Sequence, residues 1–208
     1  MKLRPYQICV SGAAAGETVE TSKHLSQKLG EAIAHHKHTL LTGATIGLPY
    51  HAALGAKKAG GLSIGFSPAG SYREHVNTYK LPADAFDFIN FTGMDYVGRD
   101  MHLVRSSEAV ITVGGRMGSL HEFTTAVESH KICAVLLGSG GLADFIPTLV
   151  ERIPGIPSPG KDAIIYDTNP ERLVVRVIEA LDKKYMDFDD PSNERKKEAK
   201  SPDTNRQG

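Results

Sequence analysis

The stretch from Gly114 to Glu122 combines residue types that bind phosphate with a carboxylate placed to act beside it. It reads Gly-Gly-Arg-Met-Gly-Ser-Leu-His-Glu, follows an apolar β-branched run at 109–113 and opens a segment of helical period. Free N–H groups at the start of a helix bind anions, and the helix dipole assists them. The pattern therefore predicts a phosphate site made of Gly114, Gly115, Arg116, Met117, Gly118 and Ser119.

Glu122 lies about one turn into this expected helix, where side chains lean back toward the N-terminus. Its carboxylate can therefore reach the mouth of the anion site, to contact a ribose hydroxyl or a developing positive charge. A second interpretation stays open, because Ser119-x-x-Glu122 also matches a capping box, in which the carboxylate only accepts from a backbone N–H.

Glycine also follows other apolar runs, as in Ser11-Gly12, Thr42-Gly43 and Thr92-Gly93. Ligands of parallel sheets bind outside the carboxyl ends of the strands, and glycine lets the backbone approach them closely. Repeated glycine at one edge favours a backbone-lined site, although turns use glycine in any case. The sequence holds no P-loop motif, and the histidines at 35, 36 and 38 fall at a helix end, so we expect no metal site.

The elements that must position these residues alternate along the chain. Short apolar runs at 7–10, 39–41, 62–66, 88–91, 109–113, 132–137 and 163–166 are separated by helical segments and by an irregular stretch at 68–84. Such alternation predicts an α/β fold: a doubly wound, mostly parallel, Rossmann-like sheet with helices on both faces. We expect one nucleotide-binding domain over 1–184 and a disordered polar tail over 185–208.

Composition narrows the possible partners. The 208 residues carry 24 Lys and Arg against 24 Asp and Glu, so no electrostatic footprint for nucleic acid is expected. No apolar run approaches the ~18 residues of a membrane span, and no signal sequence is recognisable, which favours a cytoplasmic protein without membrane partners. Cys9 and Cys133 lie in apolar runs and are expected to be buried in strands.

The segment 114–122 resembles the Gly-Gly-x-Gly-Thr-x-x-Glu motif of the Lonely Guy family of phosphoribohydrolases, whose superfamily includes molybdenum-cofactor carrier proteins. Val10-Ser11-Gly12 resembles that family's first strand and turn, and 43–49, with Gly43 and Gly47, its second glycine loop. Arg99 begins a stretch that resembles the helix carrying the family's catalytic arginine. The resemblance covers roughly 7–137.

The resemblance implies hydrolysis of the N-glycosidic bond of a nucleoside 5′-monophosphate, with release of free base and ribose 5-phosphate and with no cofactor or metal. Phosphate would rest on 115–119, and Ser11, Gly12, Gly43 and Gly47 would help to bind the nucleotide. Glu122 would stabilise oxocarbenium character and position water, and Arg99 would balance charge. The family builds its sites near a dimer interface, which implies a homo-oligomer.

Several positions depart from the family pattern. Asp100 replaces a lysine, Arg116 a glycine, Ser119 a threonine and His121 an acidic residue. These changes keep a second function open: a non-catalytic carrier of a nucleotide-like phosphate ligand such as molybdenum cofactor. A third reading is an oligomeric domain with a vestigial site.

The expected helix that carries Arg99 also leaves two interpretations. An apolar stripe at helical spacing is formed by Met94, Val97, Met101 and Val104. Arg99 lies roughly opposite this stripe, so it is either on a solvated face or a site residue on a second face. His102, three residues on, is a secondary candidate for that face.

Overall fold

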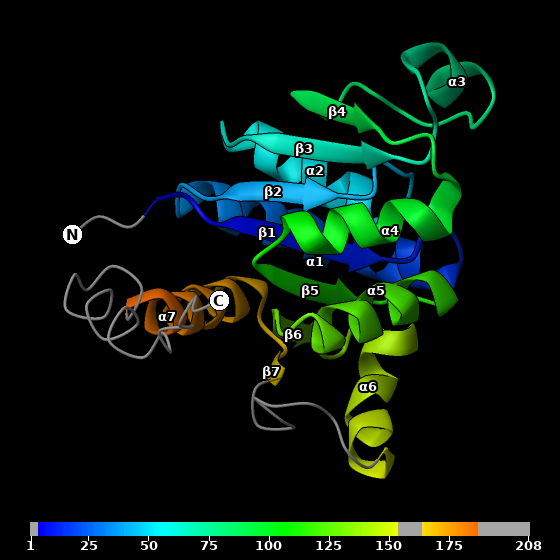
Figure 1. The fold of residues 1–208 in the computed structure, drawn as a ribbon. Coiled ribbons are helices and arrows are strands. Elements are labelled where there is room, and N and C mark those ends of the chain that lie inside the picture. The colour runs from blue at the N-terminus through cyan, green and yellow to red at the C-terminus, as the bar shows by residue number, and fades with distance from the viewer. Residues whose placement is uncertain (1–3, 154–163, 187–208) are drawn as a thin grey trace, which may run out of the picture.

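The computed structural model describes residues 4–153 and 164–186, and its elements follow the expected alternation (Figure 1). The strands are β1 (Gln7–Gly12), β2 (Thr39–Thr42), β3 (Ser63–Ser67), β4 (Phe88–Phe91), β5 (Ala109–Val113), β6 (Ile132–Leu136) and β7 (Ile164–Asp167). The helices are α1 (Glu17–His35), α2 (Leu48–Lys58), α3 (Tyr72–Asn77), α4 (Asp95–Ser106), α5 (Met117–Glu128), α6 (Gly141–Arg152) and α7 (Pro170–Met186).

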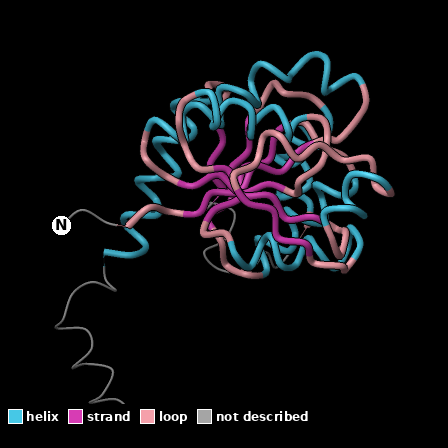
Figure 2. The backbone as a smooth tube through the Cα atoms, turned by 90° about the horizontal axis from the view of Figure 1, so that it is seen from above, coloured by secondary structure: helices cyan, strands magenta, loops and turns pink. Residues whose placement is uncertain are grey.

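All seven strands are parallel and form one sheet in the order β4-β3-β2-β1-β5-β6-β7. Helices α1, α2 and α7 pack on one face, and α4, α5 and α6 pack on the other, so the strands lie between two helical layers (Figure 2). The doubly wound α/β fold expected from the sequence is confirmed.

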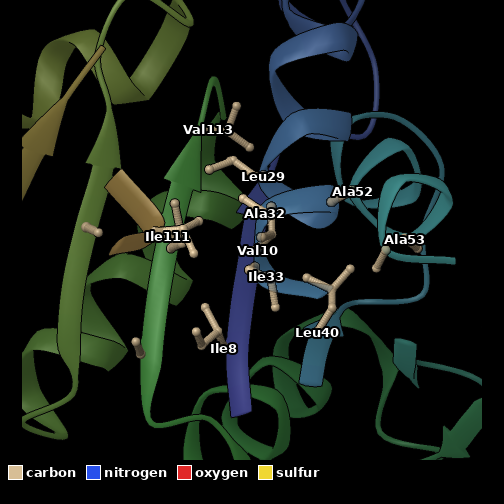
Figure 3. Packing of buried hydrophobic residues seen from close by; sticks show 14 of the residues in the cluster. Ile8, Val10, Leu29, Ala32, Ile33, Leu40, Ala52, Ala53, Ile111 and Val113 are labelled. Carbon is tan, nitrogen blue, oxygen red and sulfur yellow. The ribbon is translucent and has the colours of Figure 1, made fainter. Parts of the chain in front are cut away.

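Apolar strand residues pack against small and aliphatic residues of the helices, and this packing makes the core. On one face Ile8, Val10 and Ile111 belong to the same buried cluster as residues of α1 and α2, in which Leu29 and Ile33 of α1 are fully buried (Figure 3). Burying each such aliphatic side chain contributes about 1.5–3 kcal/mol. Cys9 and Cys133 are buried free thiols, as expected for strand residues of a sheet covered on both faces.

Successive strands are added on one side of β1 as far as β4, and on the other side of β1 from β5 onward. The chain passes from β1 to β2 on one side, whereas β5 lies on the other side, with Ser11 opposite Thr112 and Gly12 opposite Val113. Loops that leave neighbouring strands in opposite directions leave a crevice at the carboxyl edge of the sheet. The loops after β1 and β5, which hold most of the expected site residues, therefore meet there.

The structure differs from expectation in the stretch 68–84, where α3 forms. Ser71 caps this helix, because its Oγ accepts from the N–H of Glu74 at 3.2 Å, while the Glu74 carboxylate accepts from the N–H of Gly70 at 2.7 Å. This reciprocal pattern is close to a capping box. The nearby proline and glycines obscured it in the sequence.

At the other end of the domain, α7 continues past position 184 to Met186. Its Tyr185 packs partly buried against the core and stacks on Tyr6, with ring centroids 6.0 Å apart. Positions 187–208, where a disordered tail is expected, lie outside the described residues.

Candidate functional site

A cavity of about 190 Å³ lies over the carboxyl end of β1, bounded by α4 and by the start of α5. Most of the expected site residues line it: Ser11, Gly12, Gly43, Arg99, Arg116, Gly118, Ser119 and Glu122. Sequence reasoning missed Ala13, Ala14, Thr45, Pro49, Tyr96 and Asp100, which complete the wall together with Val10.

Four expected site residues lie outside the lining. Met117 is 77% exposed. Gly114 and Gly115 have φ angles of 56° and 102°, so they shape the turn rather than face the cavity. At Gly47, with φ 77°, a Cβ would lie 2.4 Å from the carbonyl oxygen of Ala13, so the close approach there is between two loops.

The start of α5 is open toward the cavity. Arg116 is its N-cap, and the N–H of Leu120 donates to the carbonyl of Arg116 at 2.9 Å. The N–H groups of Gly118 and Ser119 precede that bond and belong to the first turn, which has no intrahelical acceptors. A Cβ at Gly118 would meet nothing within 4 Å, so space for an anion adjoins these donors.

The glycine loop before α5 is fixed by its neighbours. The N–H of Gly114 donates to Ser139 Oγ at 2.8 Å, and the carbonyls of Gly114 and Gly115 accept from Ala143 and Leu142 at 2.8 and 3.0 Å. The start of α6 therefore holds the loop in place. Such a preformed cradle of N–H groups needs little ordering when an anion binds.

Glu122 is buried at the bottom of the cavity, 7% exposed, and it does not cap α5. Its Oε2 accepts a hydrogen bond from Ser11 Oγ, and the carboxyl of Asp100, which also lines the cavity, lies close enough to raise its pKa. Because Arg116 is the N-cap, Ser119 lies inside the helix and cannot form the expected box. The capping-box interpretation of Glu122 is therefore wrong.

The surroundings of Glu122 favour its neutral form. Burial, followed by the negative charge of Asp100, raises the pKa of Glu122 to about 7, against the opposing effects of the Arg99 cation and the Ser11 hydrogen bond. A carboxyl poised near neutral pH can exchange a proton with a bound reactant at little cost.

Arg99 is buried, 4% exposed, and fully engaged on one side. Its Nη1 donates to the carbonyl of Phe66 at 2.8 Å and to the carbonyl of Gly43, and its Nε donates to Asp100 Oδ1 at 3.0 Å. A Cβ at Gly43 would lie 2.2 Å from that Nη1. Gly43 is therefore needed because the guanidinium, rather than a ligand, approaches its backbone.

The solvated-face interpretation of Arg99 is wrong, because its side chain is buried. The buried residues of α4 are Arg99 and Asp100 together with Leu103 and Val104, the last member of the apolar stripe. The other members of that stripe, Met94, Val97 and Met101, are 49%, 69% and 40% exposed. Backbone carbonyls after β2 and at β3 satisfy the buried guanidinium, which removes the usual penalty for burying it.

Two further side chains border this cluster. Tyr96 lines the cavity and lies beside Arg99, whose Cζ is 5.8 Å from the ring centroid. His121, on α5, places Nδ1 2.9 Å from Asp100 Oδ2, and its side chain is 38% exposed. His102 lies outside the lining, exposed, with Nε2 2.9 Å from the sulfur of Met94.

Within the described ranges, no three His, Cys, Asp or Glu residues are grouped so that they could hold a metal ion. Over the same residues, no helix has the length and apolar character needed to cross a bilayer.

Comparison with known proteins places this arrangement in a family. The model of the SLOG cluster4 family matches residues 5–174. The chain belongs to this family. An uncharacterized protein of Archaeoglobus fulgidus is 34% identical to this SLOG cluster4 protein over 130 residues, which are 62% of this chain and 79% of the relative.

Solved structures place the SLOG cluster4 protein beside molybdenum-cofactor proteins. The molybdenum cofactor carrier protein of Chlamydomonas reinhardtii is 26% identical with a TM-score of 0.68, and the alignment covers 86% of this chain and 99% of that one. The molybdenum cofactor binding protein of Rippkaea orientalis is also 26% identical, with a TM-score of 0.67 and the same coverage. These matches confirm the superfamily that the segment 114–122 resembles.

Proposed function

We propose that this SLOG cluster4 protein is a nucleoside 5′-monophosphate phosphoribohydrolase. The observation that carries the proposal is the position of Glu122, a buried carboxyl with a raised pKa, in the same small cavity as the open start of α5. A carboxyl beside an anion site is unfavourable for binding alone. It is useful where positive charge develops next to a phosphate-bearing ribose.

The 5′-phosphate rests on the first turn of α5, where the N–H groups of Gly118 and Ser119 and the helix dipole stabilise it. Arg116, at the N-cap and on the cavity wall, adds a positive charge at the same end. The nucleoside then extends over Gly12 toward Glu122. Tyr96 offers an aromatic face at the cavity wall for a planar base.

In the reaction, the bond from C1′ to the base nitrogen breaks and its electron pair leaves with the base. The ionised form of Glu122 stabilises the positive charge that develops on the ribose. A water oxygen bonds to C1′ and gives one proton to the Glu122 carboxylate, while the base takes up a proton from solvent. The products are the free base and ribose 5-phosphate.

Arg99 and Ser11 keep part of the Glu122 population ionised. Both lower the pKa of Glu122 against the effect of burial. Because Nε and Nη1 of Arg99 are held by Asp100 and by two carbonyls, Nη2 is the nitrogen that remains for a ligand. Arg99 therefore balances charge at the reaction centre from a fixed position.

The second candidate is a carrier that binds a nucleotide-like phosphate ligand without changing it. It is favoured by the likeness to the two molybdenum-cofactor proteins and by the replacements at Asp100 and Arg116. In this reading the α5 start and Arg116 hold the phosphate, and Glu122 donates to a ligand hydroxyl or amide in its protonated form.

The deciding experiment measures base release from a panel of nucleoside 5′-monophosphates, with binding of the same panel and of molybdenum cofactor followed in parallel. Turnover of at least one nucleotide supports the hydrolase. Tight binding of a ligand with no base released from any member supports the carrier and ends the hydrolase proposal.

We also propose that the protein forms a homo-oligomer. The exposed apolar face of α4, formed by Met94, Tyr96, Val97 and Met101, adjoins the cavity through Tyr96. A second copy that covers this face would shield it from water and close the cavity mouth. Sedimentation of the wild type and of Val97→Asp tests this: the variant should be monomeric and folded, and a monomeric wild type contradicts it.

A further inference from the structure

Asp100 lies between two groups that can each hold a proton. On one side its Oδ2 is 2.9 Å from His121 Nδ1, and on the other it lines the same cavity as Glu122, close enough to raise the pKa of that carboxyl. Asp100 and Glu122 are 5% and 7% exposed, whereas the His121 side chain is 38% exposed. The three residues thus form a continuous chain from solvent to the bottom of the cavity.

The charges in this cluster do not balance unless a proton is present. Two neighbouring buried carboxyls resist double ionisation, because like charges repel strongly where water is excluded. Arg99 supplies one positive charge and neutralises one carboxylate through its bond to Asp100. The second carboxyl therefore needs either its own proton or a second cation, and His121 is placed to be that cation.

Other groups around Glu122 do not provide such a switch. From α4 it faces Arg99 and Asp100, and from β1 it faces Ser11 and Cys9. Burial raises the pKa of the Cys9 thiol well above its usual value, so that thiol stays neutral. The ordinary charge change of histidine falls near neutral pH, unlike that of arginine or serine.

We propose that His121 sets the charge of Glu122 through Asp100, so that the three residues share protons as one unit connected to solvent. When His121 is charged it pairs with Asp100, and Glu122 is released to ionise. When His121 is neutral, the Glu122 proton is held against Asp100. Asp100 and His121, two positions that depart from the family pattern, are therefore in direct contact with each other.

The catalytic consequence rests on the proposed hydrolase function. The proton that Glu122 takes from water passes to the Asp100 carboxylate, and Asp100 then gives it to Nδ1 of neutral His121. His121 releases a proton to solvent, which returns Asp100 to its ionised form and His121 to its neutral form. Glu122 then returns to its ionised form for the next turnover. His121 is a positioning residue in this scheme, since it acts through Asp100.

The test follows ionisation of Glu122 itself, by infrared difference spectra of the carboxyl band between wild type and Glu122→Gln across pH in the full chain. Three variants are compared. His121→Asn keeps an N–H toward Asp100 but takes up no proton, Asp100→Asn removes the bridging charge, and His24→Asn removes an exposed histidine on α1 as a control.

We expect the midpoint of Glu122 ionisation to rise by about one pH unit in His121→Asn, because an opposite charge is lost behind Asp100. It should fall in Asp100→Asn and stay unchanged in His24→Asn. An unchanged midpoint in His121→Asn overturns the proposal. That variant alone decides the matter if Asp100→Asn does not fold, because His121 is only partly buried.

A second readout separates this inference from the proposed function. If a nucleotide is hydrolysed, His121→Ala should lower kcat more than it changes KM, and imidazole in the buffer should restore part of the rate. A shifted midpoint without base release from any nucleotide ends the hydrolase proposal and leaves the shared protons standing. Base release with an unchanged midpoint of Glu122 ionisation in His121→Asn supports the hydrolase and ends the proposal of shared protons.

Discussion

Two buried carboxyls at the carboxyl edge of the same sheet are held in opposite states. Asp167, at the end of β7, is 8% exposed and accepts two hydrogen bonds of 2.6 Å from Arg172. These bonds, with the N–H of Asn169, hold the pKa of Asp167 well below its usual range. Glu122, 7% exposed on α5, has its pKa raised.

The difference lies in which influence on the pKa is largest: for Glu122 it is burial, followed by the charge of Asp100, whereas for Asp167 it is the hydrogen bond from Arg172. Asp167 is surrounded by donors that repay its loss of water, and it ties α7 to the end of the sheet. Glu122 faces another carboxyl, and its cation, Arg99, is bonded to Asp100 instead. A carboxyl left in an unfavourable state beside an open cavity is typical of a functional site, whereas a fully satisfied one is structural.

Replacing each carboxyl by the corresponding amide should distinguish the two most clearly in the rate of catalysis. Glu122→Gln cannot supply negative charge or accept a proton from water, so base release should fall by about 10²–10⁴-fold. Asp167→Asn, the matched change at the other carboxyl, should leave kcat within about twofold, because it lies outside the cavity lining. Rates are measured on the nucleotide that the wild type turns over best.

Melting curves of both variants accompany these rates. A stably folded Glu122→Gln variant with wild-type turnover would contradict the distinction between Glu122 as a functional carboxyl and Asp167 as a structural one. Loss of activity in Asp167→Asn at a temperature where it is fully folded would do the same.

The next largest effect concerns the anion site, which adjoins Glu122 in the cavity whose lining does not include Asp167. Gly118→Val places a branched side chain beside the free N–H groups of α5, in the space that a phosphate would occupy. Nucleotide affinity should fall at least about tenfold, which corresponds to about 1.4 kcal/mol. Isothermal titration with nucleoside monophosphates and with inorganic phosphate measures this.

Gly118→Ala gives the control for that experiment. Alanine suits a helix better than glycine by about 1 kcal/mol, and a Cβ at this position meets nothing in the structure. The variant should be at least as stable as the wild type and still bind less tightly. Unchanged affinity in both variants contradicts a phosphate site at the start of α5.

The fold was predictable because its signals are local and repeated. Apolar runs such as 109–113 are continuous, as a strand covered on both faces requires, and most of them are separated by a helical segment. The same reasoning found Ser11, Gly118 and Glu122, since residues after parallel strands must meet at one edge.

The orientation of α4 was not predictable from its own residues. Most of its apolar stripe is exposed, yet Arg99 and Asp100 are buried beside Leu103 and Val104. The reason lies far away in the sequence, in carbonyls of Gly43 and Phe66 that accept from the guanidinium. Asp100 was missed as a site residue for a similar reason. Its role depends on His121 and Glu122, which lie on another helix.

The third prediction concerns pH: of the two carboxyls, Glu122 should titrate between pH 5 and pH 8 and Asp167 should not. Folding raises the pKa of Glu122 from 4.5 to about 7, so the folded state binds that proton more tightly. The stability gained is complete below pH 4.5 and is lost as pH rises through about 7. It amounts to something on the order of 1–3 kcal/mol.

The measurement is the free energy of unfolding in urea at pH 5 and pH 8. The wild type should lose more stability over this interval than Glu122→Gln, in which the titrating group is absent. Asp167→Asn should lose as much as the wild type, because the pKa of Asp167 lies below the whole interval. Equal slopes in wild type and Glu122→Gln would show that Glu122 does not titrate here.

The smallest effect expected is the stability cost of Asp167→Asn at neutral pH. Arg172 and Arg176 are 62% and 46% exposed, so both can return to water when the carboxylate is gone. The loss should be about 1 kcal/mol, in the range of partly exposed ion pairs, rather than the larger cost of stranding a buried cation. It should shrink in 1 M salt, where the surviving charges are screened. An Asp167→Asn variant as stable as the wild type, or more stable, would mean that Asp167 is as poorly compensated as Glu122, and the contrast between satisfied and unsatisfied carboxyls would then fail.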